Sequence, residues 1–148
     1  MDRGAGSRAG PGDGHPARLI LADTSAWIEY LRHTRTSTDR AMESLRAHEI
    51  SITEPVLMEL LAGAPGESAA ARLHEDLVRV GSLRVEPMDY EAAAGIYRAV
   101  RRAGHTMRNQ LACLIAAVAI RNRVPVLHND ADFGFIAEHT ALQVYEPG

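Results

Sequence analysis

The fold of this chain follows from the run Leu19-Ile20-Leu21-Ala22-Asp23, four apolar residues closed by an acid. An unbroken apolar run of this length is typical of a short strand that is buried on both faces, as in a parallel sheet. The pattern from Thr24 to Leu31 then predicts a helix, with Asp23 or Thr24 as its cap. A buried strand that leads directly into a helix is the repeating unit of an α/β fold.

The same alternation continues along the chain. We expect further strands at 50–52, 83–85, 124–127 and 142–145. We expect helices at about 36–47, from Thr53 to Gly63 or Gly66, and at 67–80, 89–103, 109–121 and 133–138. Strands that alternate with helices imply an α/β fold with a central parallel sheet flanked by helices.

Length and composition indicate one folded domain. The 148 residues favour a single domain, which we place at 18–148, and 46% of them are hydrophobic. Residues 1–17 are rich in Gly, Pro, Ser and Ala, so we expect a flexible N-terminal extension there. The longest apolar run, 111–120, is too short to cross a bilayer, and no apolar signal core follows the charged start. We therefore expect a cytoplasmic protein without a membrane segment.

The charge balance limits the possible functions. A net charge of −3 is unlike that of general nucleic-acid-binding proteins, which are usually basic. All 16 basic residues are Arg, which indicates either genomic composition bias or phosphate recognition by planar guanidinium groups. The single Cys113 lies in an apolar run and is interpreted as a small core residue, not as a nucleophile.

Acidic residues follow two of the predicted strands. Asp23 follows the first strand, and Asp130 and Asp132 follow the strand at 124–127. If these strands are neighbours, their carboxylates converge at one edge of the sheet, where open α/β proteins bind ligands. Carboxylates that lie close together repel one another, and Mg²⁺ or Mn²⁺ with oxygen ligands relieves that repulsion. Each acid taken alone is more often a helix cap or a turn residue.

Glu59 is a third candidate acid. On a helical wheel it lies beside the apolar stripe of the helix that begins near Thr53, where an acid can point into a cleft. A solvated helix Glu is the simpler interpretation of this residue when it is taken in isolation.

Four blocks of the sequence, in this order along the chain, resemble the PIN-domain family of nucleases. Within that family the likeness is greatest to the VapC toxins. The blocks are Leu21-Ala22-Asp23-Thr24-Ser25-Ala26-Trp27-Ile28, Glu54-Pro55-Val56-Leu57-Met58-Glu59-Leu60-Leu61-Ala62-Gly63, Thr106-Met107-Arg108 with Cys113-Leu114-Ile115-Ala116-Ala117, and His128-Asn129-Asp130-Ala131-Asp132-Phe133. The likeness covers about 19–146, and it implies a three-layer PIN-like fold.

The resemblance also implies roles for individual residues. Asp23, Glu59 and Asp130 would be active-site carboxylates that hold Mg²⁺, or alternatively Mn²⁺, and Asp132 would bind metal directly or through water. Thr24 or Ser25 would add a hydroxyl near the site. The family cleaves single-stranded or looped RNA, its toxins are neutralised by a cognate antitoxin, and homodimers are common.

One position departs from the family pattern. Similar sequences carry Asp immediately before the Cys-Leu-Ile-Ala-Ala stretch, where this chain has Ala112. The loss of an acid there should reduce metal affinity or activity by at least about 10–100-fold, the cost of disturbing even the partners of a metal ligand. We hypothesise that Ala112 is an engineered inactivating substitution, and natural decay of the site is the alternative.

Several further residues are candidates for contacts. Arg108 is placed to meet a phosphate, and Arg98, Arg101 and Arg102 share one helix face that either binds RNA or is simply solvated. His128 is interpreted as structural. The apolar residues Trp27, Ile28 and Leu31, together with 56–61, can form a groove for an antitoxin segment.

Other functions fit the sequence less well. A degenerate PIN module that binds RNA or antitoxin without cutting is the main alternative, and Ala112 supports it. A phosphoacceptor domain needs a Lys opposite the Asp, and this chain has none. A dinucleotide-binding fold is disfavoured because no Gly-x-Gly-x-x-Gly motif follows the first strand.

Overall fold

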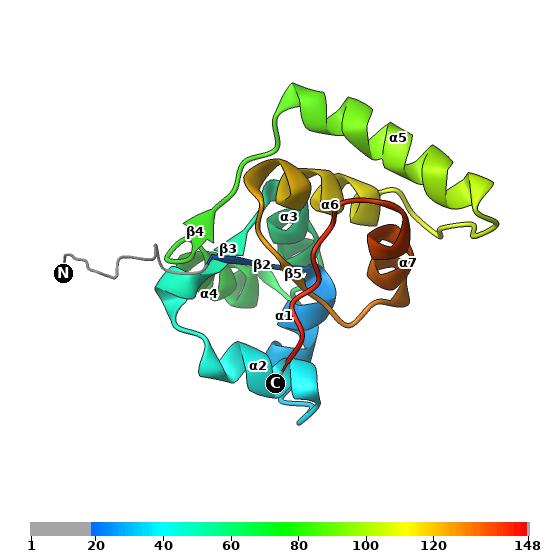
Figure 1. Cartoon of the computed structure of the whole chain (residues 1–148). Coiled ribbons are helices and arrows are strands. Elements are labelled where there is room, and N and C mark those ends of the chain that lie inside the picture. The colour runs from blue at the N-terminus through cyan, green and yellow to red at the C-terminus, as the bar shows by residue number, and fades with distance from the viewer. Residues whose placement is uncertain (1–18, 148) are drawn as a thin grey trace, which may run out of the picture.

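The computed structural model describes residues 19–147, so the predicted extension at 1–17 lies outside the described residues. Its centre is a four-stranded parallel sheet in the order β4-β3-β2-β5 (Figure 1). The strands are β2 (Ile20–Ala22), β3 (Ile50–Ile52), β4 (Gly81–Ser82) and β5 (Val126–Leu127). The predicted α/β class with a central parallel sheet is confirmed.

Helices connect the strands and cover the sheet. They are α1 (Thr24–Leu31), α2 (Ser37–Ser44), α3 (Glu54–Ala62), α4 (Glu67–Leu77), α5 (Pro87–Arg102), α6 (Leu111–Asn122) and α7 (Ala131–His139), with a short 3-10 turn at Ala47–Glu49. In Figure 1, α1 and α2 lie below the sheet and α5 and α6 lie above it. In the part of the chain that the structure describes, no helix has the length and hydrophobicity needed to cross a membrane.

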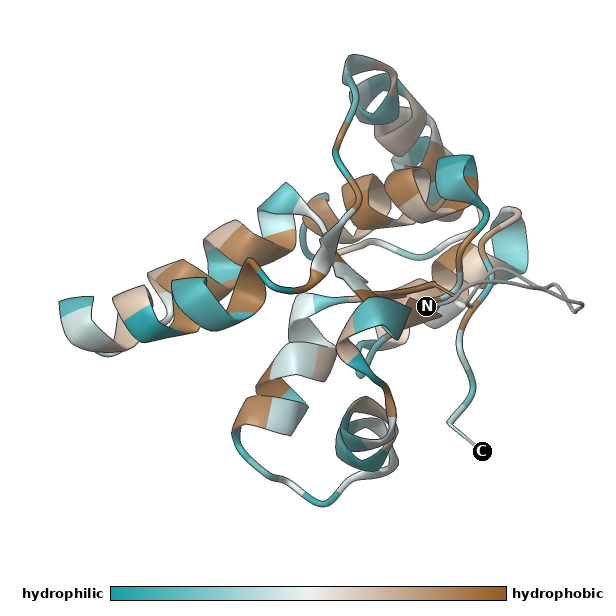
Figure 2. Ribbon diagram, turned by 90° about the vertical axis from the view of Figure 1, so that its left-hand side faces the viewer, coloured by the Kyte–Doolittle hydropathy of each residue, from teal (hydrophilic) through white to brown (hydrophobic). Residues whose placement is uncertain are grey.

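The strands are short, and all of them except the exposed edge strand β4 are deeply buried. Every residue of β2, β3 and β5 is buried, which explains the unbroken apolar runs in the sequence. Figure 2 shows hydrophobic residues concentrated along the central strands, whereas the outer helices carry hydrophilic residues on their exposed sides. The apolar patterns therefore set both the strands and the inward faces of the helices.

Helix α6 is the central helix of the upper layer. Eight consecutive residues, 112–119, are buried, because α6 lies between the sheet and α5 (Figure 1). A helix that is hydrophobic on all sides must be enclosed by other elements. The start of α6 is thereby held firmly beside the carboxyl edge of the sheet.

Two predicted strands differ in the structure. The strand expected at 83–85 lies two residues earlier, at Gly81–Ser82, because after Leu83, which still donates to Ile52, the Val85 N–H donates to the Glu54 side chain instead. The strand expected at 142–145 is reduced to one bridge between Val126 and Val144. Only Val126 of β5 pairs on this side, because its N–H donates to the Gln143 carbonyl and its carbonyl accepts from Tyr145 N, whereas Pro125 and Leu127 turn their carbonyls toward β2.

An ion pair between the buried Asp89 and the partly exposed Arg121 fixes α5 against α6. Arg121 Nε and Nη2 donate to the two carboxylate oxygens of Asp89 at 2.9 Å each, and Nη2 also donates to the Arg84 carbonyl at 2.8 Å. The Asp89 side chain is 2% exposed. The Arg121 hydrogen bonds outweigh burial and hold the pKa of Asp89 below its ordinary value of 3.8.

Replacing this acid tests the contribution of the pair. Asp89→Asn should lower the free energy of unfolding by about 2 kcal/mol at neutral pH, since it leaves Arg121 without a charged partner. Because the pKa of Asp89 is lowered by folding, its stabilisation is complete above 3.8 and is lost as the pH falls through the lower folded-state value. Urea unfolding at neutral and acid pH measures the difference. Arg121→Met and the double variant complete a mutant cycle, and strictly additive losses would contradict the pairing.

Candidate active site

The pairing of β2 with β5 brings two acidic segments to one edge of the sheet. Ala22 lies opposite Leu127 in the parallel register, and the Asp23 N–H donates to the Leu127 carbonyl at 3.0 Å. Asp23 and the segment 128–130 therefore leave the sheet side by side. The condition set by the sequence, that the two acid-bearing strands be neighbours, is met.

Ser25 fastens these two segments to each other. Asp23 is the N-cap of α1, and its Oδ2 accepts from Ser25 N at 3.0 Å and from Ser25 Oγ at 2.6 Å. Ser25 Oγ in turn accepts from Asn129 N at 2.9 Å. One hydroxyl thus orients the Asp23 carboxylate and anchors the backbone next to Asp130.

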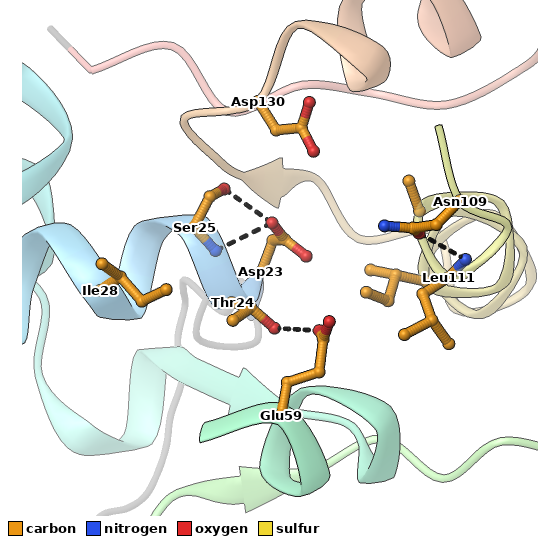
Figure 3. Close-up of a pocket in the computed structure, with 10 residues that line it drawn as sticks. Asp23, Thr24, Ser25, Ile28, Glu59, Asn109, Leu111 and Asp130 are labelled. Carbon is orange, nitrogen blue, oxygen red and sulfur yellow. Dashed lines mark hydrogen bonds between the residues drawn. The ribbon is translucent and has the colours of Figure 1, made fainter. Parts of the chain in front are cut away.

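Glu59 reaches the same place from α3. This helix follows β3, the neighbour of β2 on its other side, and Glu59 lies in the middle of the helix. Thr24 Oγ1 donates to Glu59 Oε1 at 2.6 Å. The hydroxyl of the first α1 residue therefore holds the Glu59 carboxylate beside Asp23 (Figure 3).

Asp130 occupies the N-cap of α7. Its Oδ1 accepts from Asp132 N at 3.0 Å, and its own N–H donates to His128 Nδ1 at 3.1 Å. The helical pattern that starts at Phe133 favours Asp132 as the cap, and that expectation is wrong, because the helix begins at Ala131. The cap bond fixes one oxygen of Asp130 and leaves the carboxylate facing the pocket (Figure 3).

The three acids line one pocket of about 190 Å³. Its walls are formed by Asp23, Thr24, Ser25, Ile28, Glu59, Asn109, Leu111, Ala112, Ile115 and Asp130. Three of these side chains are carboxylates and none is basic. Figure 3 shows Asp130 above the pocket, Asp23 at its back and Glu59 below it.

The electrostatics of the pocket favour a cation. Asp23 is 6% exposed, and burial raises the pKa of its carboxyl above the ordinary value. The hydrogen bonds from Ser25 and Thr24 lower the pKa of Asp23, and the charge of Asp130 raises it further. Negative charge is therefore poorly compensated by the protein here, which is the condition under which a carboxylate site gains from binding a metal ion.

The donor set fits a hard divalent ion in part. Carboxylate and hydroxyl oxygens are the ligands that Mg²⁺ and Mn²⁺ prefer. Among the described residues, however, no three His, Cys, Asp or Glu side chains lie close enough together to hold one ion by themselves. Mg²⁺ usually keeps several waters and takes only one or two protein carboxylates, so the open spacing is compatible with a hydrated ion.

Comparison with known proteins decides the family. The model of the PIN domain matches residues 20–138. Ribonuclease VapC11 of Mycobacterium tuberculosis and VapC ribonuclease Mb1587 of Mycobacterium bovis are each 46% identical over 129 residues, which cover 84% of this chain and 96% of each relative. The chain belongs to the PIN-domain family and to its VapC branch.

A chain in a solved structure has the same fold as this protein, although the two sequences share little identity. The crystal structure of VapBC2 from Rickettsia felis, bound to a DNA fragment from its promoter, matches with a TM-score of 0.68 and 19% identity. The match covers 86% of this chain and 97% of that chain. The predicted PIN-like architecture is thereby confirmed.

Asp132 lies apart from the other acids of this VapC-family site. It is not part of the pocket lining, and its Oδ1 lies 3.2 Å from His105 Nε2. The His105 ring stacks on Phe135, with 3.7 Å between the ring centroids. Asp132 therefore links the first turn of α7 to the loop between α5 and α6. Its role as a metal ligand stays a prediction.

Two other candidates have defined surroundings. Arg108 is exposed and lies outside the pocket lining. His128 accepts from Asp130 N and lies against Phe133, and burial lowers the pKa of its ring. The interpretation of His128 as a structural residue agrees with these contacts, since its Nδ1 is used to support the Asp130 backbone.

Two residues that line the pocket, Ala112 and Asn109, lie at or just before the start of α6, and only Ala112 was predicted from the sequence to lie there. Ala112 lines the pocket and is 6% exposed, so the family position of the missing acid faces the other carboxylates. Asn109 also lines the pocket, although no motif or pattern in the sequence pointed to it. Its place in the polar segment just before the helix that carries Ala112 was the signal that could have identified it.

The buried carboxylate of Asp23 should lower the free energy of unfolding of this PIN domain when no metal ion is bound. Asp23→Asn should raise the free energy of unfolding by about 1 kcal/mol in metal-free buffer at neutral pH, because a neutral amide keeps the Ser25 contacts without a buried charge. Since the pKa of Asp23 is raised by folding, the cost is full above that raised value and vanishes as the pH falls toward 3.8.

The measurement is urea unfolding as a function of pH, with and without Mg²⁺. Asp76→Asn, at an exposed position of α4, is the matched control and should have no effect. Wild type should regain the difference in saturating Mg²⁺, because an ion that binds only the folded state stabilises it. A less stable Asp23→Asn protein at neutral pH would contradict the electrostatic account.

Proposed function

We propose that this VapC-family protein is a metal-dependent endoribonuclease of a toxin–antitoxin pair. The observation that carries the proposal is the convergence of Asp23, Glu59 and Asp130 on one pocket that no basic side chain lines. The 46% identical relatives carry the name ribonuclease, which supports RNA as the substrate. The toxin would act in the cytoplasm, on single-stranded or looped segments of tRNA, rRNA or mRNA.

The proposed mechanism assigns a separate task to each element. Thr24 and Ser25 use their hydroxyls to orient the Glu59 and Asp23 carboxylates. Asp130 is held by the first turn of α7. Asp23, Glu59 and Asp130 would hold a hydrated Mg²⁺ or Mn²⁺, one or two of them directly and the rest through water. When bound, such an ion lowers the pKa of a water and neutralises charge on the phosphodiester.

An arginine face on α5 is the proposed contact for the RNA backbone. Arg98, Arg101 and Arg102 are all exposed, and the Arg101 guanidinium lies 5.6 Å from the centre of the Tyr97 ring. Helix α5 packs on α6, whose first residues line the pocket. Phosphates that flank the cleaved bond could therefore contact this face, and Arg108 lies in the loop between the two helices.

A cognate antitoxin and a second copy of the chain are the proposed protein partners. The Rickettsia felis match is a VapBC2 complex, which supports an antitoxin. Leu31 on α1 and Met58 on α3 are 43% and 57% exposed, and α1 contacts α3, so they offer apolar surface for such a segment. Trp27 is only 5% exposed and belongs to the core, so it does not contribute to the groove expected there.

The second candidate function is a PIN module that binds RNA or antitoxin but does not cut. It is favoured by one observation, the methyl group of Ala112 at the position where an acid would face the pocket. Wild-type protein that binds RNA and cleaves it no faster than Asp130→Asn would identify this alternative. Cleavage that depends on divalent ions and on Asp130 would support the nuclease.

Restoring the missing acid is the direct test of the site. Ala112→Asp should raise Mg²⁺-dependent cleavage of RNA by at least about 10–100-fold, because it adds a fourth carboxylate to the pocket. Ala112→Asn has nearly the same volume without the charge, and should give little gain. The rate of cleavage of a labelled RNA oligonucleotide at several Mg²⁺ concentrations is the measurement. Equal activity of all three proteins would remove Ala112 as the cause of impairment and count against an engineered inactivating substitution.

The salt dependence of binding tests the arginine face. Neutralising Arg98, Arg101 and Arg102 together to Gln should weaken RNA binding and flatten its dependence on salt, because each phosphate that the protein neutralises adds about 0.7 to the slope. Dissociation constants for single-stranded RNA between low and moderate salt give the slope. Replacement of three exposed arginines away from α5, Arg46, Arg72 and Arg79, with Gln is the control for net charge. A slope that is unchanged in the triple variant would exclude this face.

A further inference from the structure

Asn109 is the one polar residue lining the pocket, among the described residues, to which the proposed mechanism gives no role. It is exposed, lies just before α6 and forms part of the pocket lining. Its Oδ1 accepts from the Leu111 N–H at 2.9 Å. Because a backbone N–H can bond only to the oxygen of a side-chain amide, this contact turns Nδ2 the other way. Figure 3 shows that the amide nitrogen points into the pocket, toward the side where Asp23 and Asp130 lie.

The other polar side chains of the pocket are either carboxylates or hydroxyls that already donate a hydrogen bond to a carboxylate. The Thr24 hydroxyl donates to Glu59 and the Ser25 hydroxyl donates to Asp23. Among the lining residues within 19–147, no side chain other than Asn109 carries an N–H group. Asn109 Nδ2 is therefore the side-chain donor that remains for a molecule entering the pocket.

A neutral donor suits this position better than a charged one. An Arg or Lys at 109 would pair with the carboxylates and compete with a metal ion for them. An amide donates hydrogen bonds without neutralising the acids, so it can coexist with a cation site. A phosphodiester has anionic oxygens that the carboxylates repel, and it needs donors on the wall that the acids do not occupy.

We propose that Asn109 is a substrate-contacting residue whose Nδ2 donates to a non-bridging oxygen of the RNA phosphodiester in the pocket. The inference rests on the proposed nuclease function and deepens it. Ala112, in the first turn of α6, lies three residues further along the chain and contributes only a methyl group. The polar contribution of this end of α6 is thus a hydrogen-bond donor in place of an acid.

Two substitutions separate the donor from the hydrogen bond that Asn109 Oδ1 accepts from the Leu111 N–H. Asn109→Asp keeps an oxygen for the Leu111 N–H but replaces the Nδ2 donor with a negatively charged oxygen. Asn109→Ser also retains an oxygen for this turn, and its shorter side chain withdraws from the pocket. Gln110→Ala is the matched control, because Gln110 is exposed, makes no side-chain cap bond to α6 and lies outside the pocket lining. Thermal unfolding of each protein reports whether the turn before α6 is preserved.

The measurement is the affinity for a fluorescein-labelled single-stranded RNA oligonucleotide with Mg²⁺, followed by anisotropy, with the RNA checked for integrity on a gel. Asn109→Ser should weaken binding about tenfold, the usual effect of removing one hydrogen bond to a charged group. Asn109→Asp should weaken it more, by about a hundredfold, because repulsion is added. Gln110→Ala should bind like wild type.

The outcomes distinguish this inference from the function on which it rests. Wild-type affinity in both Asn109 variants would overturn the role of Asn109 and leave the nuclease proposal standing. Absence of RNA binding in wild type as well would overturn the proposed function together with this contact. In the Ala112→Asp background, a rise in KM or a fall in kcat for Asn109→Ser, with unchanged thermal unfolding, would support the contact independently.

Discussion

The parallel pairing of β2 with β5 is the constraint on which the rest of the site depends. The hydrogen bond from Asp23 N to the Leu127 carbonyl extends the ladder past the end of β2 and places Asp23 beside the segment that leads to Asp130. Ser25 then bonds to both sides of this junction. A shift of one residue in this register would turn the side chains of β2 to the opposite face and separate the acids. The burial of the strands on both faces is what makes such a shift costly.

Two buried acids of this protein, Asp89 and Asp23, differ in how their charge is compensated. Asp89 is buried but receives two hydrogen bonds from Arg121, which keep the pKa of its carboxyl low, so it strengthens the packing of α5 on α6. Asp23 is also buried, but it has only hydroxyl and backbone donors and a second carboxylate nearby, and its pKa is raised. A buried acid paired with Arg is structural, whereas a buried acid among other acids is destabilising unless a ligand compensates it. This difference, more than the number of acids, is what makes the pocket the candidate functional site.

The start of α6 forms the remaining wall of the site. The rest of the helix is enclosed between α5 and the sheet, so its first residues have little freedom to move. Ala112 and Asn109 therefore meet the acids in a fixed arrangement, and the character of this wall depends on which side chains these positions carry. With Ala and Asn there, the wall offers a methyl group and an amide donor, which suits contact with an anionic substrate more than the binding of a further cation.

The sequence by itself determined the alternation of strands and helices, the parallel sheet and the placement of acids at strand ends, because these features follow from local apolar periodicity and from the geometry of parallel strands. It also supplied the family, through four blocks in order that the matching PIN-domain model covers. Only the tertiary structure decided where each polar side chain points. Glu59 is held by Thr24, 35 residues away, and Asp132 is drawn to His105, 27 residues away, although Asp132 and Asp130 are two positions apart. The place of Asn109 in the pocket lining was likewise hidden, since side-chain direction depends on contacts between segments that are distant in the sequence and that no local pattern encodes.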